Sequence, residues 1–276
     1  MSDLVRTWGR PRLRNSRLIV GWTMDAGGLG GAVTAHLRDE LDAEPFAEIE
    51  PVDFFALSGV AIINDIVQFP EARFYVCPEK NLVIFRSTPP DHGWHRFFSL
   101  VLDVARDLCN VKEVYTVGSM IAFGPHTAPR QYFGTVNSPK LKKDLGPLGV
   151  TRDINFETPP GGKPTLNSFF LWTAKRRRVR GANLWVPVPF YLISVLDPAA
   201  HVTMLDLLDR RLELGLDTTG LAAAAAAQDE RIARLRAVDP AVDGTIGRLE
   251  GGQRLAEGEG EKLAKTVQKH LRESRD

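Results

Sequence analysis

The chain has 276 residues, of which 43% are hydrophobic and 25% charged, a composition that excludes disordered and fibrous classes. Its 35 Lys and Arg residues nearly balance 34 Asp and Glu, so no global field would attract nucleic acid or an anionic membrane. Cys77 and Cys109 are too few for a disulfide framework or a thiolate metal site. The most apolar stretch, 186–196, is shorter than the ~20 residues of a membrane helix, so we expect a cytoplasmic protein that does not cross a membrane.

The first elements of the chain predict the opening unit of an α/β sheet. Residues 17–22 form a short apolar run typical of a buried strand, and 25–31 form a loop rich in glycine. A helix follows to about residue 41, because leucine and valine recur along one face. Strand, glycine loop and helix in this order are typical of α/β proteins.

Strands and helices continue to alternate up to about residue 190. The segment 78–80 predicts a hairpin connection between two strands, and Pro164 is expected in the first turn of a helix. The further strands are expected at 60–69, 73–77, 81–86, 111–118, 131–137 and 182–189, the helices at 94–108 and 164–177, and a long loop at 119–130.

The last third of the chain predicts helices only, at 198–214, 219–238, 240–249 and 261–272. Asp197 and Asp239 each precede a proline, which pairs an N-cap with a proline at the first helical position. We therefore expect a three-layer α/β sandwich around a mostly parallel sheet in a domain 1–196. A helical C-terminal region, 197–276, would pack on that domain or on a neighbouring subunit.

The glycine loop is the first candidate binding site, through Asp25, Gly28 and Gly30. Backbone amides at a helix start attract anions. The dinucleotide fingerprint, however, would place its third glycine at position 33, which is Val33. The loop is therefore either a tight turn, with Asp25 or a neighbour capping the helix, or part of a ligand pocket.

The second candidate is the loop that leaves the strand 111–118, since ligands bind at the carboxyl ends of strands in open α/β sheets. His126, Thr127 and Arg130 offer an imidazole, a hydroxyl and a guanidinium to a polar ligand. No carboxylate is next to His126 in the sequence to orient it as a base. The alternative is a loop that forms hydrogen bonds with its own backbone.

Other motifs make no positive case for a catalytic centre. His92 and His95 lack further metal ligands, and Ser119 lacks the glycine of a nucleophile elbow. The basic run 175–180 is interpreted as a solvated surface, with an acidic protein patch or RNA as alternatives. We expect no cofactor and no metal.

Three motifs resemble the proteasome assembly chaperone family, second-subunit type. The segment 18–30 is similar to its first motif, 118–130 to its second, and Pro189-Phe-Tyr191 to a third that is usually Pro-His-Tyr. The pair Leu249-Glu250 and the short terminal helix look like the actinobacterial branch of bacterial members. The resemblance covers nearly the whole chain.

The resemblance implies a three-layer fold similar to phosphorylases and peptidyl hydrolases, and a homo-oligomer, with a trimer expected in bacterial members. Eukaryotic and archaeal relatives act as binding proteins that help assemble or engage proteasome rings. The chain departs from the family at Phe190, at Ala128, where arginine is frequent, and in the loop 157–161. Its end, 274–276, lacks the hydrophobic-Tyr pattern of the proteasome-binding tail of some relatives.

Two functions follow as hypotheses. The first is a non-enzymatic, oligomeric chaperone or adaptor that binds protein partners through its helical region. The alternative is a small-molecule-binding protein or a hydrolase-like or phosphorylase-like enzyme, with Asp25, Gly28, His126, Thr127 and Arg130 converging at one pocket. Nucleic-acid binding is not expected.

Overall fold

A computed structural model describes residues 3–56, 60–151, 154–155, 157, 159 and 161–273. The C-terminal tail 274–276 lies outside the described residues, and so does part of the loop 157–161. Residue contacts divide the chain into two compact units. The first unit contains 1–24, 30–117 and 133–184, and the second contains 25–29, 118–132 and 185–276.

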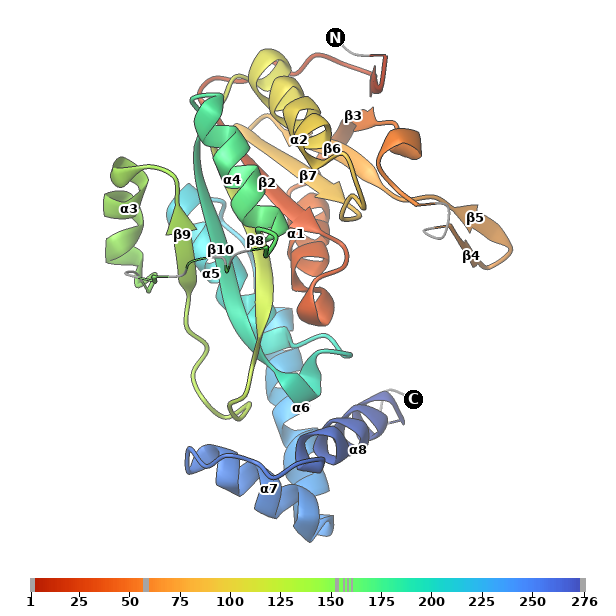
Figure 1. The fold of residues 1–276 in the computed structure, drawn as a ribbon, viewed down its shortest axis with the longest axis vertical. Coiled ribbons are helices and arrows are strands. Elements are labelled where there is room, and N and C mark those ends of the chain that lie inside the picture. Colours follow the sequence, from red (N-terminus) through yellow and green to blue (C-terminus); the bar gives the residue numbers. More distant parts are fainter. Residues whose placement is uncertain are drawn as a thin grey trace. The chain divides into compact units, whose positions relative to one another are not determined.

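An eight-stranded sheet organises the first unit (Figure 1). Its order is β1 (Val5–Thr7), β3 (Glu44–Ile49), β6 (Ala72–Cys77), β7 (Leu82–Ser87), β2 (Ser16–Trp22), β8 (Val111–Ala122), β10 (Arg180–Pro189) and β9 (Phe133–Val136). Strand β2 is parallel to β7 and β8, whereas the pairs β1–β3, β3–β6 and β6–β7 are antiparallel. The sheet is therefore mixed, and the prediction of a mostly parallel sheet was wrong, because short connections such as the turn between β6 and β7 force neighbours to run antiparallel.

Helices cover both faces of this sheet, which confirms the predicted α/β sandwich. On one face, Trp22 of β2 lies with its ring 5.9 Å from that of Phe98 in α2 (Trp94–Asp103), and Phe98 contacts Phe170 of α4 (Leu166–Arg176). Figure 1 shows α2 and α4 side by side over this face. Successive residues of a strand face opposite sides of the sheet, so a Cβ on the neighbouring Gly21 would lie on the other face. There it meets α1 (Leu29–Glu40) so closely that a Cβ would lie 2.2 Å from the Gly30 carbonyl oxygen.

Several elements of the first unit differ from the sequence-based expectation. Strand β8 continues to Ala122, four residues beyond its predicted end, so that the following loop is shorter. Strand β3 and helix α3 (Pro139–Leu145) were not predicted. Pro164 lies before the helix rather than in its first turn, because Thr165 is the N-cap and accepts a hydrogen bond from the Ser168 backbone N–H.

The predicted strand 60–69 is a separate hairpin, β4 (Ala61–Ile63) with β5 (Ile66–Gln68). It forms its own two-stranded sheet and projects from the first unit (Figure 1). Ile62, Ile66 and Phe69 are 73%, 62% and 67% exposed. An isolated two-stranded hairpin is only marginally stable in water, so this projection is suited to contact with another surface.

The second unit contains the predicted helices, α5 (Pro198–Leu212), α6 (Thr219–Val238), α7 (Pro240–Glu250) and α8 (Glu259–Glu273). Asp197 and Asp239 cap α5 and α7 as predicted, each accepting two backbone N–H groups. In α8 the apolar residues Leu263, Val267 and Leu271 recur every four residues and are buried. Within the described ranges, no helix combines the length and apolar character needed to cross a bilayer.

Candidate functional site

The two loops predicted from the sequence meet at Asp25 and Ser119. The Oδ2 atom of Asp25 accepts a hydrogen bond of 3.0 Å from the Ser119 backbone N–H, and the Ser119 hydroxyl donates to the Ala26 carbonyl oxygen. Asp25 occupies the N-cap position of the short helix η1 (Ala26–Gly28), but its side chain makes no capping bond there. Of the two expected possibilities, Asp25 or a neighbour as the cap, the Asp25 side chain does not cap η1, because its carboxylate turns toward β8 instead. Gly118 permits this approach, since a Cβ there would lie 3.0 Å from Oδ2.

The predicted glycines have different structural roles. Gly28 has a φ of +65°, a left-handed conformation that glycine adopts without strain, and it lines a surface recess together with Arg272. Gly30 belongs to the first unit, where a Cβ would lie only 2.9 Å from the Val117 carbonyl oxygen. Gly30 is therefore required for close packing of α1 against the sheet.

His126 is buried and oriented by a residue from the third family motif. The Tyr191 hydroxyl accepts a 2.6 Å hydrogen bond from the His126 backbone N–H and lies 2.9 Å from Nδ1 of the same residue. Burial lowers the pKa of His126, which favours the neutral imidazole, and burial also raises the pKa of Tyr191. Sequence reasoning missed this partner because Tyr191 is 65 residues away; its place directly after a strand, in the third motif, was the available signal.

Arg130 forms a buried ion pair with Asp197, the residue that caps α5. Its Nη2 lies 2.8 Å from Oδ2 of Asp197, and its Nη1 donates to the carbonyl oxygens of His126 and Ala128, both at 3.0 Å. The side chains of Arg130 and Asp197 are only 8% and 2% exposed. The guanidinium therefore fixes the loop 123–130 to the start of α5.

Thr127 connects the same loop to α7. Its hydroxyl donates a 3.0 Å hydrogen bond to Oε1 of Glu250, which also pairs with Arg236 of α6 at 2.8 Å. The Arg236 guanidinium lowers the pKa of Glu250, so the carboxylate is ionised at neutral pH. Thr127, Glu250 and Arg236 thus link the loop to two helices of the second unit.

These contacts define the chemistry available to the predicted site residues. His126 faces Tyr191 and the loop backbone rather than a nucleophile, and Arg130 donates to protein oxygens. The described residues include no group of three or more His, Cys, Asp and Glu that could hold a metal ion. The structure joins Asp25 to the start of the second loop and places His126, Thr127 and Arg130 in one network, while a ligand at these residues stays a prediction.

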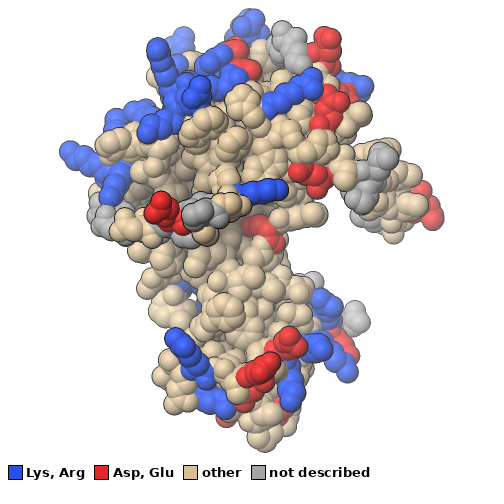
Figure 2. Space-filling model, viewed as in Figure 1, with Lys and Arg blue, Asp and Glu red and all other residues tan. Residues whose placement is uncertain are grey.

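The basic run 175–180 lies on the surface of the first unit at the end of α4, where Figure 2 shows Lys and Arg side chains gathered. Part of its charge is neutralised within the protein. Arg177 pairs with Asp103, and Arg180 pairs with Glu113 at 3.0 Å. The guanidinium of Arg176 stacks over the Trp172 ring at 5.0 Å.

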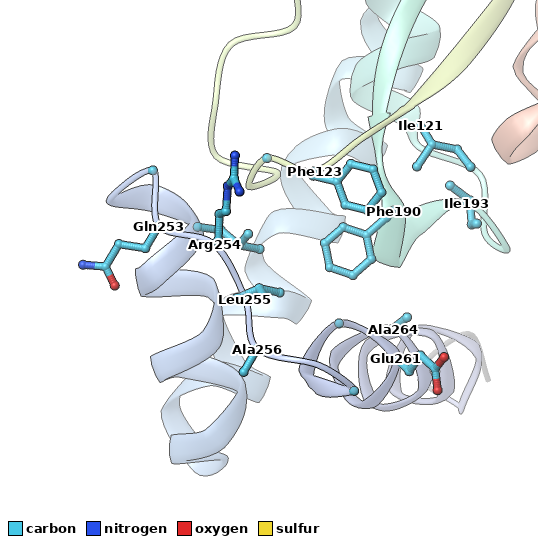
Figure 3. Close-up of a pocket in the computed structure, with 15 residues that line it drawn as sticks. Ile121, Phe123, Phe190, Ile193, Gln253, Arg254, Leu255, Ala256, Glu261 and Ala264 are labelled. Atoms are coloured by element: carbon cyan, nitrogen blue, oxygen red, sulfur yellow. The ribbon is translucent and has the colours of Figure 1, made fainter.

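A cavity of about 940 Å³ lies in the second unit at the ends of β8 and β10 (Figure 3). The rings of Phe123 and Phe190 stack at 5.7 Å with an angle of 27° and form one wall. Ile121 of β8, Gly124 of the loop after it and Ile193 after β10 also line the cavity. The remaining lining comes from the end of α7, the connection to α8 and the first turns of α8, and comprises Leu249, Gly252, Gln253, Arg254, Leu255, Ala256, Gly258, Gly260, Glu261 and Ala264. Strand-end loops therefore do surround a cavity, but the predicted polar residues are not its lining.

The cavity is not predictable from the sequence, although one of its residues, Phe190, departs from the third motif. Phe190 stands where the third motif usually has histidine, and this departure gives the cavity an apolar wall instead of a polar one. The connection 251–258 carried no apolar periodicity, so its contribution to the lining was not visible before the fold was known.

A comparison with protein-family models decides the family. The PAC2 family model matches residues 18–236, about four fifths of the chain. The chain belongs to the PAC2 family. This finding confirms the resemblance based on the three motifs. A comparison with curated proteins found no match to this PAC2 family member.

Solved structures similar to this PAC2 family member share its fold. A Mycobacterium tuberculosis protein of unknown function, Rv2714, has a TM-score of 0.76 and 21% identity, with 91% of each chain covered. The M. tuberculosis proteasome-assembly chaperone homologue Rv2125 has a TM-score of 0.70 and 22% identity, covering 81% of this chain and 96% of its own. The archaeal proteasome activator PbaB of Pyrococcus furiosus has a TM-score of 0.66 and 22% identity, covering 84% and 98%.

Proposed function

We propose that this protein is a non-catalytic, oligomeric chaperone or adaptor that binds protein partners in the cytoplasm. The observation that carries the proposal is membership of the PAC2 family over residues 18–236. Structural neighbours described as a proteasome-assembly chaperone homologue and as a proteasome activator support it. Proteasome subunits are therefore the first partners to test.

The hairpin β4–β5 supports a role in protein contacts. Its exposed Ile62, Ile66 and Phe69 place apolar surface in water, and such surfaces commonly mark protein interfaces. Figure 2 shows few charged atoms on this projection. We propose that the hairpin contacts a second copy of the chain and contributes to a homo-oligomer, with a trimer as the expected state.

Two measurements on the purified protein test this proposal. Native mass spectrometry gives the number of copies in the oligomer. Ile62→Asp combined with Ile66→Asp should shift the oligomer to monomers, because assembly would require two charges to be buried in the interface. The double variant Lys140→Asp with Lys142→Asp, on α3 of the same unit, changes charge more strongly and should leave the copy number unchanged. A wild-type monomer that also fails to co-elute with purified proteasome subunits would contradict the proposal.

A second candidate function is small-molecule binding, which the cavity beside Phe123 and Phe190 favours. Like the pocket expected from the sequence, the cavity lies at the strand-end loops, but its lining does not include Asp25, Gly28, His126, Thr127 or Arg130. It requires no catalytic group, and a bound molecule could coexist with a protein-binding role.

A further inference from the structure

The cavity in the second unit has the size and lining of a small-molecule site. Its volume of about 940 Å³ is near the upper end of the roughly 300–1,000 Å³ range of ligand pockets. The walls come from three stretches of the chain, 121–124, 190–193 and 249–264. Because apolar side chains dominate these walls, a bound molecule must have an apolar body.

The Phe190 side of the aromatic wall packs against α8. A Cβ on Gly260 would lie 3.4 Å from the Phe190 ring, so the N-terminal turn of α8 packs directly against that ring. Phe190 in turn stacks on Phe123, whose side chain is 81% exposed. The pair thus presents an aromatic surface to anything that enters the cavity.

Two charged residues line the cavity, and they are not equivalent. Glu261 is in the first turn of α8, where the helix dipole stabilises a carboxylate. Neither Arg254 nor Glu261 has an ion-pair partner among the described residues, whereas Arg248 pairs with Glu259 at 2.6 Å. Only Glu261 has the positive end of a helix dipole beside it, because Arg254 lies on the connection between α7 and α8. In Figure 3 the Arg254 guanidinium extends toward the loop after β8, on the side of the cavity opposite Glu261.

We propose that the cavity binds an apolar organic anion, an acyl chain or aromatic body that carries one carboxylate or sulfonate. The apolar body lies against Phe123, Phe190 and Leu255, and the anionic group pairs with Arg254. An apolar cation is disfavoured, because the Arg254 guanidinium and the positive end of the α8 dipole would both repel it. This site is independent of the proposed protein-binding role and does not use His126, Thr127 or Arg130.

Fluorescence titration of the full-length protein with 8-anilinonaphthalene-1-sulfonate, an aromatic sulfonate, tests the proposal. We expect saturable binding of one probe per chain and displacement by dodecanoate. Dodecylamine, which has the same apolar chain and a positive charge, should displace the probe at least about tenfold less effectively. Equal displacement by the two competitors, or no saturable binding, would overturn the proposal.

Variants assign the site. Ala264→Phe places an additional ring in the cavity and should weaken probe binding. Arg254→Gln should weaken dodecanoate binding about tenfold while leaving the thermal midpoint unchanged, because Arg254 is exposed. Lys265→Gln is the control. It removes a cation next to Ala264 in the sequence that does not line the cavity, so this variant should bind the probe and dodecanoate like the wild type. Unaltered binding in both cavity variants would show that the probe binds elsewhere.

Loss of probe binding as the protein concentration rises would show that a second copy covers the cavity. Either result contradicts the proposal.

Discussion

Arg130 and Asp197 form an ion pair with 2.8 Å between Nη2 and Oδ2, and Asp197 uses its other oxygen to cap helix α5. A single carboxylate therefore holds both the loop after β8 and the first helix of the C-terminal region. Both side chains are buried, so neither charge is compensated by water when the other is removed.

The first prediction concerns this pair. Asp197→Ala should lower the free energy of unfolding by about 3–5 kcal/mol, because it leaves the Arg130 guanidinium buried without its partner. Asp239→Ala is the matched control, since Asp239 caps α7 in the same Asp-Pro context and should cost only about 1 kcal/mol. Urea unfolding of both variants measures the difference. Equal losses would mean that the ion pair contributes nothing beyond the helix cap.

Tyr191 provides the second prediction. Tyr191→Phe removes the acceptor of the His126 backbone N–H, and a buried donor without a partner costs about 1–3 kcal/mol. Tyr132→Phe removes a hydroxyl that bonds Asp206 at 2.8 Å near the surface, and it should cost less than about 0.5 kcal/mol. Thermal or urea unfolding compares the two. A larger loss for Tyr132→Phe would contradict the importance given to the Tyr191 contact.

The third prediction is a pH dependence caused by His126. Its pKa in the folded protein is below the ordinary 6.5 because burial disfavours the charged imidazole, with Arg130 acting in the same direction and Asp229 and Glu250 opposing it. The unfolded chain therefore binds more protons below about pH 6.5, and stability falls as the pH decreases from there toward the folded pKa.

Urea midpoints measured between pH 7.5 and pH 5 test this dependence. His126→Gln should flatten the slope below pH 6.5, and His92→Gln, at an exposed position, is the control and should keep the wild-type slope. Parallel curves for the wild type and His126→Gln would show that another group causes the dependence.

The fourth prediction tests the packing of α1 on the sheet. Gly21→Ala should destabilise the protein by about 1–3 kcal/mol or more, because the new Cβ would lie 2.2 Å from the Gly30 carbonyl oxygen and 2.5 Å from the Thr34 side chain. Gly9→Ala is the control, since nothing lies within 4 Å of its Cβ position, and its effect should stay within about 0.5 kcal/mol. A well-tolerated Gly21→Ala would contradict this close approach.

Local signals explain which elements were predictable. Asp197 and Asp239 correctly predicted the starts of two helices. A cap and a following proline act only on the first turn of a helix, so the local sequence contains the whole signal. Strand β3 was missed because Glu44 and Pro45 interrupt its β pattern, and β3 is held by its antiparallel neighbours β1 and β6. The direction of those pairings was likewise not visible locally.

The candidate site was less predictable, because its contacts join residues far apart in the chain. Arg130 was identified, but its partner Asp197 was interpreted only as a cap, and 67 residues separate them. His126 was identified without its partner Tyr191. A sequence pattern shows which side chains are present but not which of them are in contact in the fold. Side chains that seemed available to a ligand are therefore found hydrogen-bonded within the protein.

We propose that this PAC2 family member functions by binding proteins. Affinity capture from native lysate of the source organism, quantified by mass spectrometry, tests it most directly when the wild type is compared with the Ile62→Asp, Ile66→Asp variant. We predict a near-stoichiometric partner retained by the assembled wild-type protein and lost or strongly reduced with the variant. Recovery of the bait alone in both experiments would contradict the claim and favour a small-molecule role.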